Sequence, residues 1–337
     1  MRKYFKLFVF TLFVFSSCTS IKRTVRHEYT VMSYNVENLF DTVDDPKVPD
    51  EEFLATSEKM WNSTRYQKKL DDIARVISEV NPLELPEIVG LAEIENQMVL
   101  EDLVNTDQLK NRYNIVHEES PDYRGIDVAM LYRKDAFQEI SHETLPVNFP
   151  DDPNFKTRDI LHVTGEMRNK TVHIFINHWP SRIGGDDKTE PKRVLAASVL
   201  KLKVDQILAA DPKARIIIMG DMNDEPANNS LKETLGADSP GSGAKLVNLM
   251  IPEKSEGLGT YFYNGNWNML DNLIVSEAVL HGKGMKVEGQ AGNIFHNDWM
   301  IYTNKDSIKT PNRTYVGNKY VAGVSDHFPV YFKMIMK

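Results

Sequence analysis

The strongest constraint on this chain is a series of short apolar segments, separated by helical patterns and by loops rich in Gly, Pro, Asn and Asp. Short apolar runs bounded by turn residues are typical of strands that are buried on both faces. Strands and helices in alternation favour an α/β or α+β fold. The segments predicted as strands are 29–34, 88–92, 128–132, 172–176, 216–219, 273–275 and 330–332.

Two further segments carry apolar residues at the spacing of an amphipathic helix. One precedes the second predicted strand, and the other follows Pro191. We expect both helices to cover faces of the sheet structure, because an apolar stripe must be buried against another element. The apolar positions are Leu70, Ile73, Ala74, Ile77 and Val80 in the first helix, and Leu195, Val199 and Leu202 in the second.

The first residues have the pattern of a secretory signal. Basic residues precede an apolar run at 7–15, which is far too short to cross a bilayer as a helix. Residues 1–17 are therefore predicted as a signal peptide and residues 18–27 as a lipidated cysteine with a polar tether. Residues 28–337 are predicted as the folded domain.

Cys18, the single cysteine of the chain, follows small residues at the end of the apolar run. This arrangement resembles a bacterial lipobox, with Phe15 where Leu is usual. We therefore expect Cys18 to be acylated and the protein to be anchored in the cell envelope. Thr19 and Ser20 stand where an aspartate would signal inner-membrane retention, which favours the outer membrane, on its periplasmic or surface face. The alternative is a cysteine that merely ends an apolar segment.

Cysteine usage and charge exclude some classes of function. With Cys18 used for lipid attachment, no thiol remains for a disulfide or for catalysis by cysteine. The formal net charge of −8 argues against a broad electrostatic attraction to nucleic acid. A basic patch on one face would escape such a sum, so the charge weakens the nuclease interpretation without removing it.

Several predicted strands run directly into a carboxylate, an amide or an imidazole. Strand ends are rigid supports for a functional site, and repeated events of this kind indicate that one site gathers them. Taken singly, each is more simply explained as a turn residue, because turns favour Asn, Asp and Gly. The residues are Asn35, Glu93, Asn177, His178, Asp221, Asn223, Asp271 and Asn272.

These residues stand in blocks that resemble, in order, the motifs of the endonuclease/exonuclease/phosphatase superfamily. The joint signal is Gly-Asp-x-Asn at 220–223, followed near the C-terminus by Ser-Asp-His-x-Pro at 325–329. The superfamily includes deoxyribonuclease I, exonuclease III, sphingomyelinases and inositol polyphosphate 5-phosphatases. The resemblance implies an α+β fold in which two packed mixed β-sheets are flanked by helices, a four-layer α/β/β/α sandwich. The matching blocks are 34–38, 91–93, 177–180, 220–224, 270–272 and 325–329.

The resemblance also implies a Mg²⁺ site, with Mn²⁺ as the alternative ion. Glu93 is the first candidate ligand, supported by Asn35, with Asp326 or Asp221 nearby. A site with few carboxylates suits a hard cation that keeps several waters, whereas a closed zinc site would need several His or Cys. Outside the motif, Glu93 is equally well explained as a carboxylate at a helix start.

For the hydrolysis of a phosphate ester, the resemblance implies roles for five polar residues. Asp221 would orient or deprotonate the attacking water, and Asn223 would hold the phosphate. Both would face the substrate in an extended segment, where alternate residues point the same way. His327, paired with Asp271, would donate to a phosphoryl oxygen, and His178 would contact the phosphate or assist the leaving group. The alternatives are a turn for the first two residues and a buried structural histidine at 327.

Supporting roles are predicted for an acid and three arginines. Asp127 is the candidate carboxylate partner of His178, because it stands directly before a predicted strand, where it is also a plausible turn residue. Guanidinium groups are good ligands for phosphate. Arg124, Arg158 and Arg182 are therefore candidates for binding the substrate phosphate, with solvated surface as the alternative.

Together these residues predict a secreted, monomeric, Mg²⁺-dependent phosphodiesterase or endonuclease. A second prediction is a phosphomonoesterase or phospholipid diesterase, similar to the inositol phosphatases or sphingomyelinases, because the negative charge and the anchor fit small or lipid-linked phosphates. A third is a non-catalytic surface binding lipoprotein, which would require a broken site, although every expected catalytic position is filled. The expected partners are a phosphate-ester substrate (nucleic acid, lipid or small molecule) and the membrane.

Overall fold

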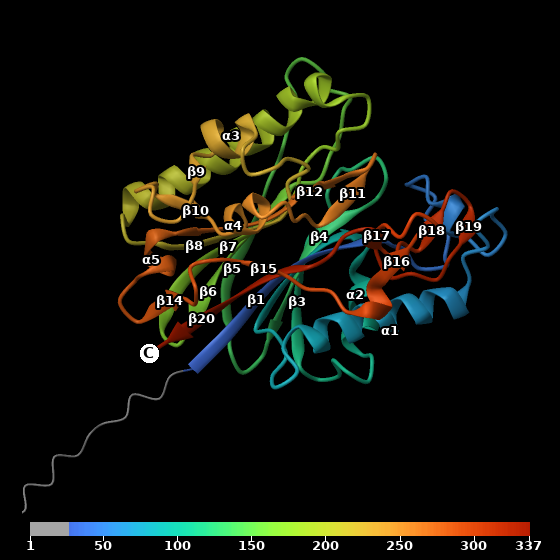
Figure 1. Cartoon of the computed structure of the whole chain (residues 1–337), viewed down its shortest axis with the longest axis horizontal. Helices are drawn as coiled ribbons and strands as arrows, with labels where there is room; N and C mark the ends of the chain where they lie inside the picture. The colour runs from blue at the N-terminus through green and yellow to red at the C-terminus, as the bar shows by residue number, and fades with distance from the viewer. Residues whose placement is uncertain (1–26) are drawn as a thin grey trace, which may run out of the picture.

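The computed structural model describes residues 27–337. The predicted signal peptide, Cys18 and the tether up to residue 26 lie outside the described residues. Two mixed seven-stranded β-sheets pack face to face, and helices cover their outer sides (Figure 1). The expected four-layer α+β sandwich is therefore confirmed. Within residues 27–337, no helix has the length and hydropathy needed to cross a membrane.

The first sheet is built around its long N-terminal strand, which runs parallel to the next strand in the chain and antiparallel to the last one. The order across the sheet is β14 (Met285–Val287), β20 (Val330–Met336), β1 (His27–Leu39), β2 (Ile88–Ile94), β4 (Asp127–Arg133) and β3 (Tyr113–His117), with β15 (Asn293–Ile294) also paired to β20.

The second sheet is antiparallel apart from two parallel pairs. Its order is β5 (Gln138–Leu145), β6 (Ile160–Met167), β7 (Lys170–His178), β8 (Arg215–Asp221), β13 (Asp271–Ser276), β10 (Leu246–Asn248) and β9 (Ala237–Asp238). Three small hairpins lie outside both sheets. They are β11 (Tyr261–Tyr263) with β12 (Asn266–Asn268), β16 (Ile301–Thr303) with β17 (Lys309–Pro311), and β18 (Tyr315–Val316) with β19 (Lys319–Tyr320).

Two long helices form the outer layers. Helix α1 (Ser63–Val80) covers the first sheet and is capped by Asn62, whose side chain accepts bonds from two backbone N–H groups of the first turn. Helix α3 (Asp186–Ala210) covers the second sheet. The shorter elements are α2 (Gln97–Val104), α4 (Ile251–Ser255), α5 (Glu277–Leu280) and the single turns η1 (Glu51–Phe53), η2 (Ser230–Thr234) and η3 (Asp298–Met300).

All seven predicted strands form, because each is buried on both faces. Val31, Ile217 and Phe332 lie in the core between the sheets, whereas Ile216 and Ile218 point outward toward α3. Alternate residues of a strand point to opposite faces, so a strand that is covered on both sides needs apolar residues throughout. The central strands are therefore held rigidly, and so are the polar residues at their ends.

Both predicted helices form. Of the apolar positions expected for the second one, Leu195 and Val199 pack partly buried against the core, whereas Leu202 does not. Helix α3 begins at Asp186, so that Pro191 lies inside it. It buries Ala196, Leu200 and Val204, whereas Leu202 is 64% exposed. Ala196 belongs to this buried face, and a pattern based on large apolar residues does not detect it.

His162 on β6 is buried beneath α3. Its ring stacks on Phe175, with the ring centroids 4.3 Å apart. Its Nδ1 atom lies 2.9 Å from Oε1 of Glu143, and its Nε2 atom lies 3.2 Å from Nδ1 of His173. Burial lowers the pKa of His162 from 6.5 to about 4, so this imidazole is neutral at physiological pH.

Replacing His162 by phenylalanine is expected to make the fold less sensitive to acid. Below about pH 6.5 the unfolded chain binds a proton that the folded chain does not accept until about pH 4, so the free energy of unfolding falls as the pH drops through this window. The loss from this residue amounts to about 2 kcal/mol at about pH 5. Urea unfolding of both proteins at about pH 7.5 and about pH 5 measures the difference. Equal acid sensitivity of the two proteins would contradict this assignment.

Candidate active site

Three polar residues lie in one row across the second sheet. Strands β7 and β8 are parallel, with His178 opposite Asp221. Strands β8 and β13 are antiparallel, with Asp271 opposite Asp221. Because residues that pair across neighbouring strands project from the same face, their side chains gather at one end of the sheet.

Asn35 of β1 joins this row to the first sheet. Its Nδ2 atom donates to Oδ2 of Asp221 (3.0 Å) and lies 3.4 Å from Oε1 of Glu93. Its Oδ1 atom accepts the backbone N–H of Glu37 (2.9 Å). Asn35 therefore presents its amide nitrogen, rather than the oxygen that a cation ligand requires, to the two carboxylates. In this arrangement Asn35 positions the two carboxylates, and the ligand role predicted for it stays a prediction.

Glu93 reaches this space because β2 bulges. Its backbone has φ +66°, and the pairing with β4 passes from Ala92 to Ile94 without it. A bulge of this kind redirects a side chain. Burial raises the pKa of Glu93, but the charges of Arg124 and His327 outweigh this and hold it below its usual range. Glu93 is therefore a buried carboxylate that stays ionised.

His327 lies in the loop before β20 and is held from two sides. Its Nδ1 atom is 2.7 Å from Oδ2 of Asp271. Its ring stacks on Tyr261, with the centroids 4.8 Å apart. Burial lowers its pKa, yet the carboxylates of Asp271 and Asp221 raise it well above the ordinary value. His327 is therefore a buried imidazolium, and its Nε2 atom lies 3.8 Å from Oδ2 of Asp221.

Asp221 is the central acceptor of the group. Its Oδ2 atom lies 3.7 Å from Nε2 of His178, in addition to the contacts with Asn35 and His327. Burial, opposed by the charge of His327 and reinforced by Asp271, raises the pKa of Asp221 to about 6. A carboxylate with such a pKa suits proton transfer near neutral pH.

The segment that carries Asn223 forms a turn. Asn223 has φ +49°, and its backbone N–H donates to Oδ1 of Asp221 (2.8 Å). The prediction of an extended segment was therefore wrong, and the competing turn forms. Gly220 makes the approach possible. It has φ +138°, and a Cβ atom there would lie 1.9 Å from the carbonyl oxygen of Asn177, so only glycine fits.

The predicted pair of His178 and Asp127 does not form. Oδ2 of Asp127 is instead 3.1 Å from Nε2 of His117. The physical reason is that Asp127 begins β4 beside the end of the neighbouring strand β3, where His117 binds its carboxylate. Among the described residues, the buried Nδ1 atom of His178 has no hydrogen-bond partner. Burial, together with the charges of Arg158 and Arg124, lowers the pKa of His178 well below its usual value, so it is neutral.

Two of the three arginines predicted to bind phosphate are engaged inside the protein. Arg158 is 7% exposed and donates to the backbone carbonyls at 178–179 and to Asp122 (2.8 Å). Arg182 donates to the carbonyl of Asn223 (2.6 Å). Both guanidinium groups donate to backbone carbonyls beside the site, so these N–H donors are already used and do not bind a phosphate.

Arg124 and Asp326 lie nearer the surface. Arg124 has a side chain that is 45% exposed, and its Nη2 atom donates to Oδ1 of Asn38 (2.6 Å) and lies 3.6 Å from Oε2 of Glu93. It is the predicted arginine that remains available to a substrate. Asp326, predicted as a metal ligand, instead contacts Arg313, 3.5 Å away.

Sequence reasoning missed Tyr261 and Arg313. Tyr261 reaches the ring of His327 from the β11–β12 hairpin. A local signal for this hairpin exists, because Asn264-Gly265 between two strand-like triplets favours a two-residue turn. No comparable signal marks Arg313, whose position depends on the loop that follows β17.

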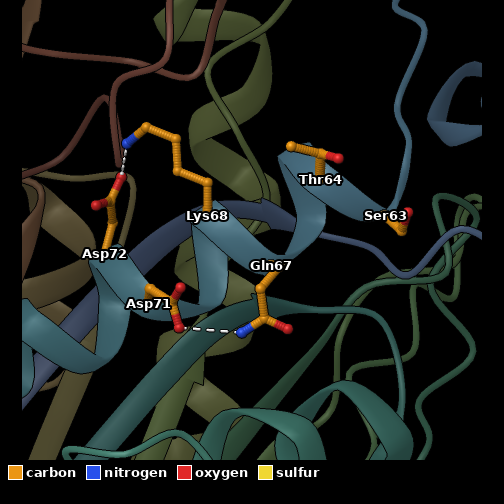
Figure 2. Close-up of a pocket in the computed structure, with 6 residues that line it drawn as sticks. All are labelled: Ser63, Thr64, Gln67, Lys68, Asp71 and Asp72. Atoms are coloured by element: carbon orange, nitrogen blue, oxygen red, sulfur yellow. Dashed lines mark hydrogen bonds and ion pairs between the residues drawn. The ribbon is translucent and has the colours of Figure 1, made fainter.

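A hollow on the surface of α1 lies apart from these residues. Figure 2 shows its polar side chains paired with one another, Lys68 with Asp72 and Gln67 with Asp71. Such pairs leave few groups free to bind a ligand, so the hollow contributes no candidate chemistry. Its lining residues are Ser63, Thr64, Gln67, Lys68, Asp71 and Asp72.

Comparisons with known proteins identify the family and the fold. The family model described as "Endonuclease/Exonuclease/phosphatase family" matches residues 30–336. Truncated TDP2 of Caenorhabditis elegans has a similar structure, with 17% identity, a TM-score of 0.56, and coverage of 92% of this chain and 98% of that chain. A mannosyl-6-phosphatase of Bacteroides thetaiotaomicron is also similar, with 16% identity, a TM-score of 0.56, and coverage of 91% of this chain and 99% of that chain. TDP2 of D. rerio, complexed with a single-strand DNA product, has 14% identity, a TM-score of 0.54, and coverage of 91% of this chain and 98% of that chain. A search of curated proteins found no match.

Proposed function

We propose that this chain, which belongs to the endonuclease/exonuclease/phosphatase family, hydrolyses a small phosphate ester with the help of a divalent cation at Glu93. Membership of the family makes the chain a phosphoester hydrolase of the nuclease or phosphatase type. One observation carries the proposal. An ionised Glu93, a proton acceptor at Asp221 and a charged His327 face the same buried space.

The donor set at Glu93 fits a hard divalent cation. Glu93 keeps its charge despite burial, and Asn35 holds it beside the second carboxylate, Asp221. Oxygen donors of this kind suit Mg²⁺, with Mn²⁺ as the alternative. When it is bound, such a cation withdraws charge from the phosphoryl oxygens of the substrate.

Each of the remaining polar side chains has a role in the hydrolysis. Asp221 accepts a proton from the attacking water, and the N–H donors of Asn35 and Asn223 orient its carboxylate. His327 is held in its charged form by Asp271 and donates to a phosphoryl oxygen that gains negative charge. Neutral His178 lies 3.7 Å from Asp221 and positions the water or the phosphate.

The distribution of positive charge favours a small substrate over a nucleic acid. Arg158 and Arg182 are engaged inside the protein, while Arg124 and Arg313 have side chains that are 45% and 39% exposed. Binding to nucleic acid relies on several contacts from Lys and Arg to backbone phosphates, and the formal net charge of this chain is −8. We therefore favour small phosphate monoesters, such as sugar phosphates, as the substrate over nucleic acid, which was the first prediction from the sequence.

A panel of substrates tests this proposal. The full chain is assayed with Mg²⁺ against mannose 6-phosphate, an inositol polyphosphate, sphingomyelin vesicles and supercoiled DNA. We expect release of inorganic phosphate from a small monoester and intact supercoiled DNA. Nicking of the DNA without release of phosphate would contradict a small substrate and would instead support an endonuclease. No turnover of any substrate would contradict the hydrolytic assignment itself.

A further inference from the structure

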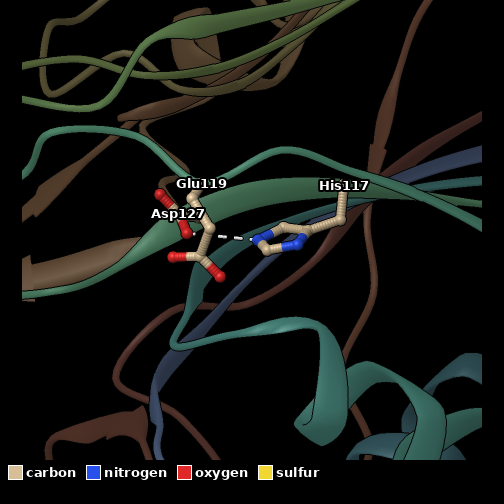
Figure 3. A group of neighbouring side chains, drawn as sticks. All are labelled: His117, Glu119 and Asp127. Carbon is tan, nitrogen blue, oxygen red and sulfur yellow. Dashed lines mark hydrogen bonds and ion pairs between the residues drawn. The ribbon is translucent and has the colours of Figure 1, made fainter. Parts of the chain in front are cut away.

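A second group of metal-binding side chains lies outside the catalytic residues, where β3 and β4 meet. His117 is the last residue of β3, Asp127 is the first residue of β4, and Glu119 lies in the loop between them. One ligand atom from each residue lies within 4.8 Å of the other two. Figure 3 shows the three side chains facing one another. Nothing in the proposed hydrolysis uses this group.

The group combines a fixed buried pair with one open ligand. Nε2 of His117 is 3.1 Å from Oδ2 of Asp127, and these side chains are 3% and 2% exposed. The other oxygen of Asp127 accepts the backbone N–H of Ser120 (2.9 Å) and also its hydroxyl. Glu119 is exposed. His117 and Asp127 are therefore held in position, and the exposed carboxylate of Glu119 is accessible to an ion from the solvent.

The charges of the group call for a cation. Glu119 and Asp127 are both carboxylates, and their ligand oxygens lie within 4.8 Å of each other. Two carboxylates in one small space repel each other unless a proton or a positive ion lies between them. A divalent ion would neutralise both at neutral pH.

We propose that His117, Glu119 and Asp127 bind a divalent transition-metal cation, Zn²⁺ or Mn²⁺, at a site separate from the one at Glu93. An imidazole nitrogen together with carboxylate oxygens suits these ions, whereas Mg²⁺ and Ca²⁺ prefer oxygen ligands alone. Three protein ligands leave the remaining positions to water.

The bound cation would stabilise the loop that carries Arg124 toward the active site. The loop at 118–126 also contains Asp122, whose carboxylate accepts from Arg158. Its two ends are fixed by His117 and Asp127, so an ion that joins these ends to Glu119 restricts the whole loop. The site therefore couples metal binding to the stability of the fold and does not depend on the proposed hydrolysis.

Calorimetric titration of the metal-free full chain with Zn²⁺ tests the site. The Glu93→Gln background weakens the cation site proposed in the active centre, and one Zn²⁺ binding event with a rise in Tm is expected to remain. Adding Glu119→Gln should raise the Kd for Zn²⁺ about tenfold or more. The matched control is Glu118→Gln, because Glu118 is also exposed but lies outside the group. It should leave the Kd unchanged.

Two further measurements test whether the change in Kd reflects the loss of a metal ligand. Because Glu119 is exposed and the change removes one of two neighbouring carboxylates, Glu119→Gln should have a Tm at least as high as that of its parent in the absence of metal. The same pair of titrations in the background with native Glu93 shows whether the Glu93→Gln change itself disturbs the fold. Absence of Zn²⁺ binding, or an equal loss of affinity in Glu119→Gln and Glu118→Gln, would overturn the proposal.

Discussion

Replacing Asp221 by asparagine is expected to lower kcat about 10³-fold while the fold is kept. The carboxylate accepts the proton of the attacking water, and an amide has no comparable basicity. The amide oxygen can still accept the backbone N–H of Asn223, which Oδ1 of Asp221 accepts at 2.8 Å in the native chain. The turn that follows β8 should therefore remain, so that the loss is chemical and not structural.

Steady-state kinetics on the substrate identified by the panel, together with thermal unfolding, measure this effect. Asp211→Asn is the matched control, because Asp211 is an exposed aspartate at the far end of α3 and should keep kcat unchanged. A value of kcat for Asp221→Asn within about tenfold of the native protein would contradict the role of Asp221 as the proton acceptor.

Replacing Asp271 by asparagine is expected to lower kcat about 10²-fold near neutral pH and to move the pH profile toward acid. Asp271 raises the pKa of His327, so without it the imidazolium loses its proton at a lower pH. The alkaline limb of the profile should therefore shift to lower pH. Asp271 also raises the pKa of Asp221, which is about 6 in the native chain. The acid limb, along which activity falls as Asp221 becomes protonated, should shift in the same direction.

The dependence of kcat on pH, measured for both proteins, checks this prediction. His327→Gln provides the comparison, because it removes the titrating group and should abolish the alkaline limb that belongs to His327. An alkaline limb at the same pH in Asp271→Asn and in the native protein would show that the carboxylate does not set the charge of His327. A structural role for Asp271 alone would lower kcat without moving either limb.

The strands that support the site could be predicted from the sequence because their signal is local. Segments such as 216–219 are buried on both faces, so every position is apolar and no partner strand has to be known. The apolar face of α3 could not be predicted in the same way. Which residues of a helix are fully buried depends on how the helix packs on the sheet, and the buried face of α3 includes the small residue Ala196 besides Leu200 and Val204.

The central residues of the site were also predicted, because they combine strand ends with motif blocks. Asn35, Glu93, Asp221, Asp271 and His327 converge as expected. The atom that Asn35 presents to the two carboxylates could not be predicted from the sequence. Asn35 presents a nitrogen because its oxygen accepts a backbone N–H two residues away, and such an orientation follows from the bulged and turned backbone around it.

The sequence by itself determined that the seven apolar segments become strands and which chemical groups stand at their ends, because burial and turn preferences act on neighbouring residues. Only the tertiary structure decided which of those groups meet. Asp127 binds His117 instead of His178, and Arg158 binds backbone carbonyls instead of remaining free. The reason is that a hydrogen bond forms only over about 3 Å. Which groups come that close depends on which strands are neighbours, and the whole fold sets that order.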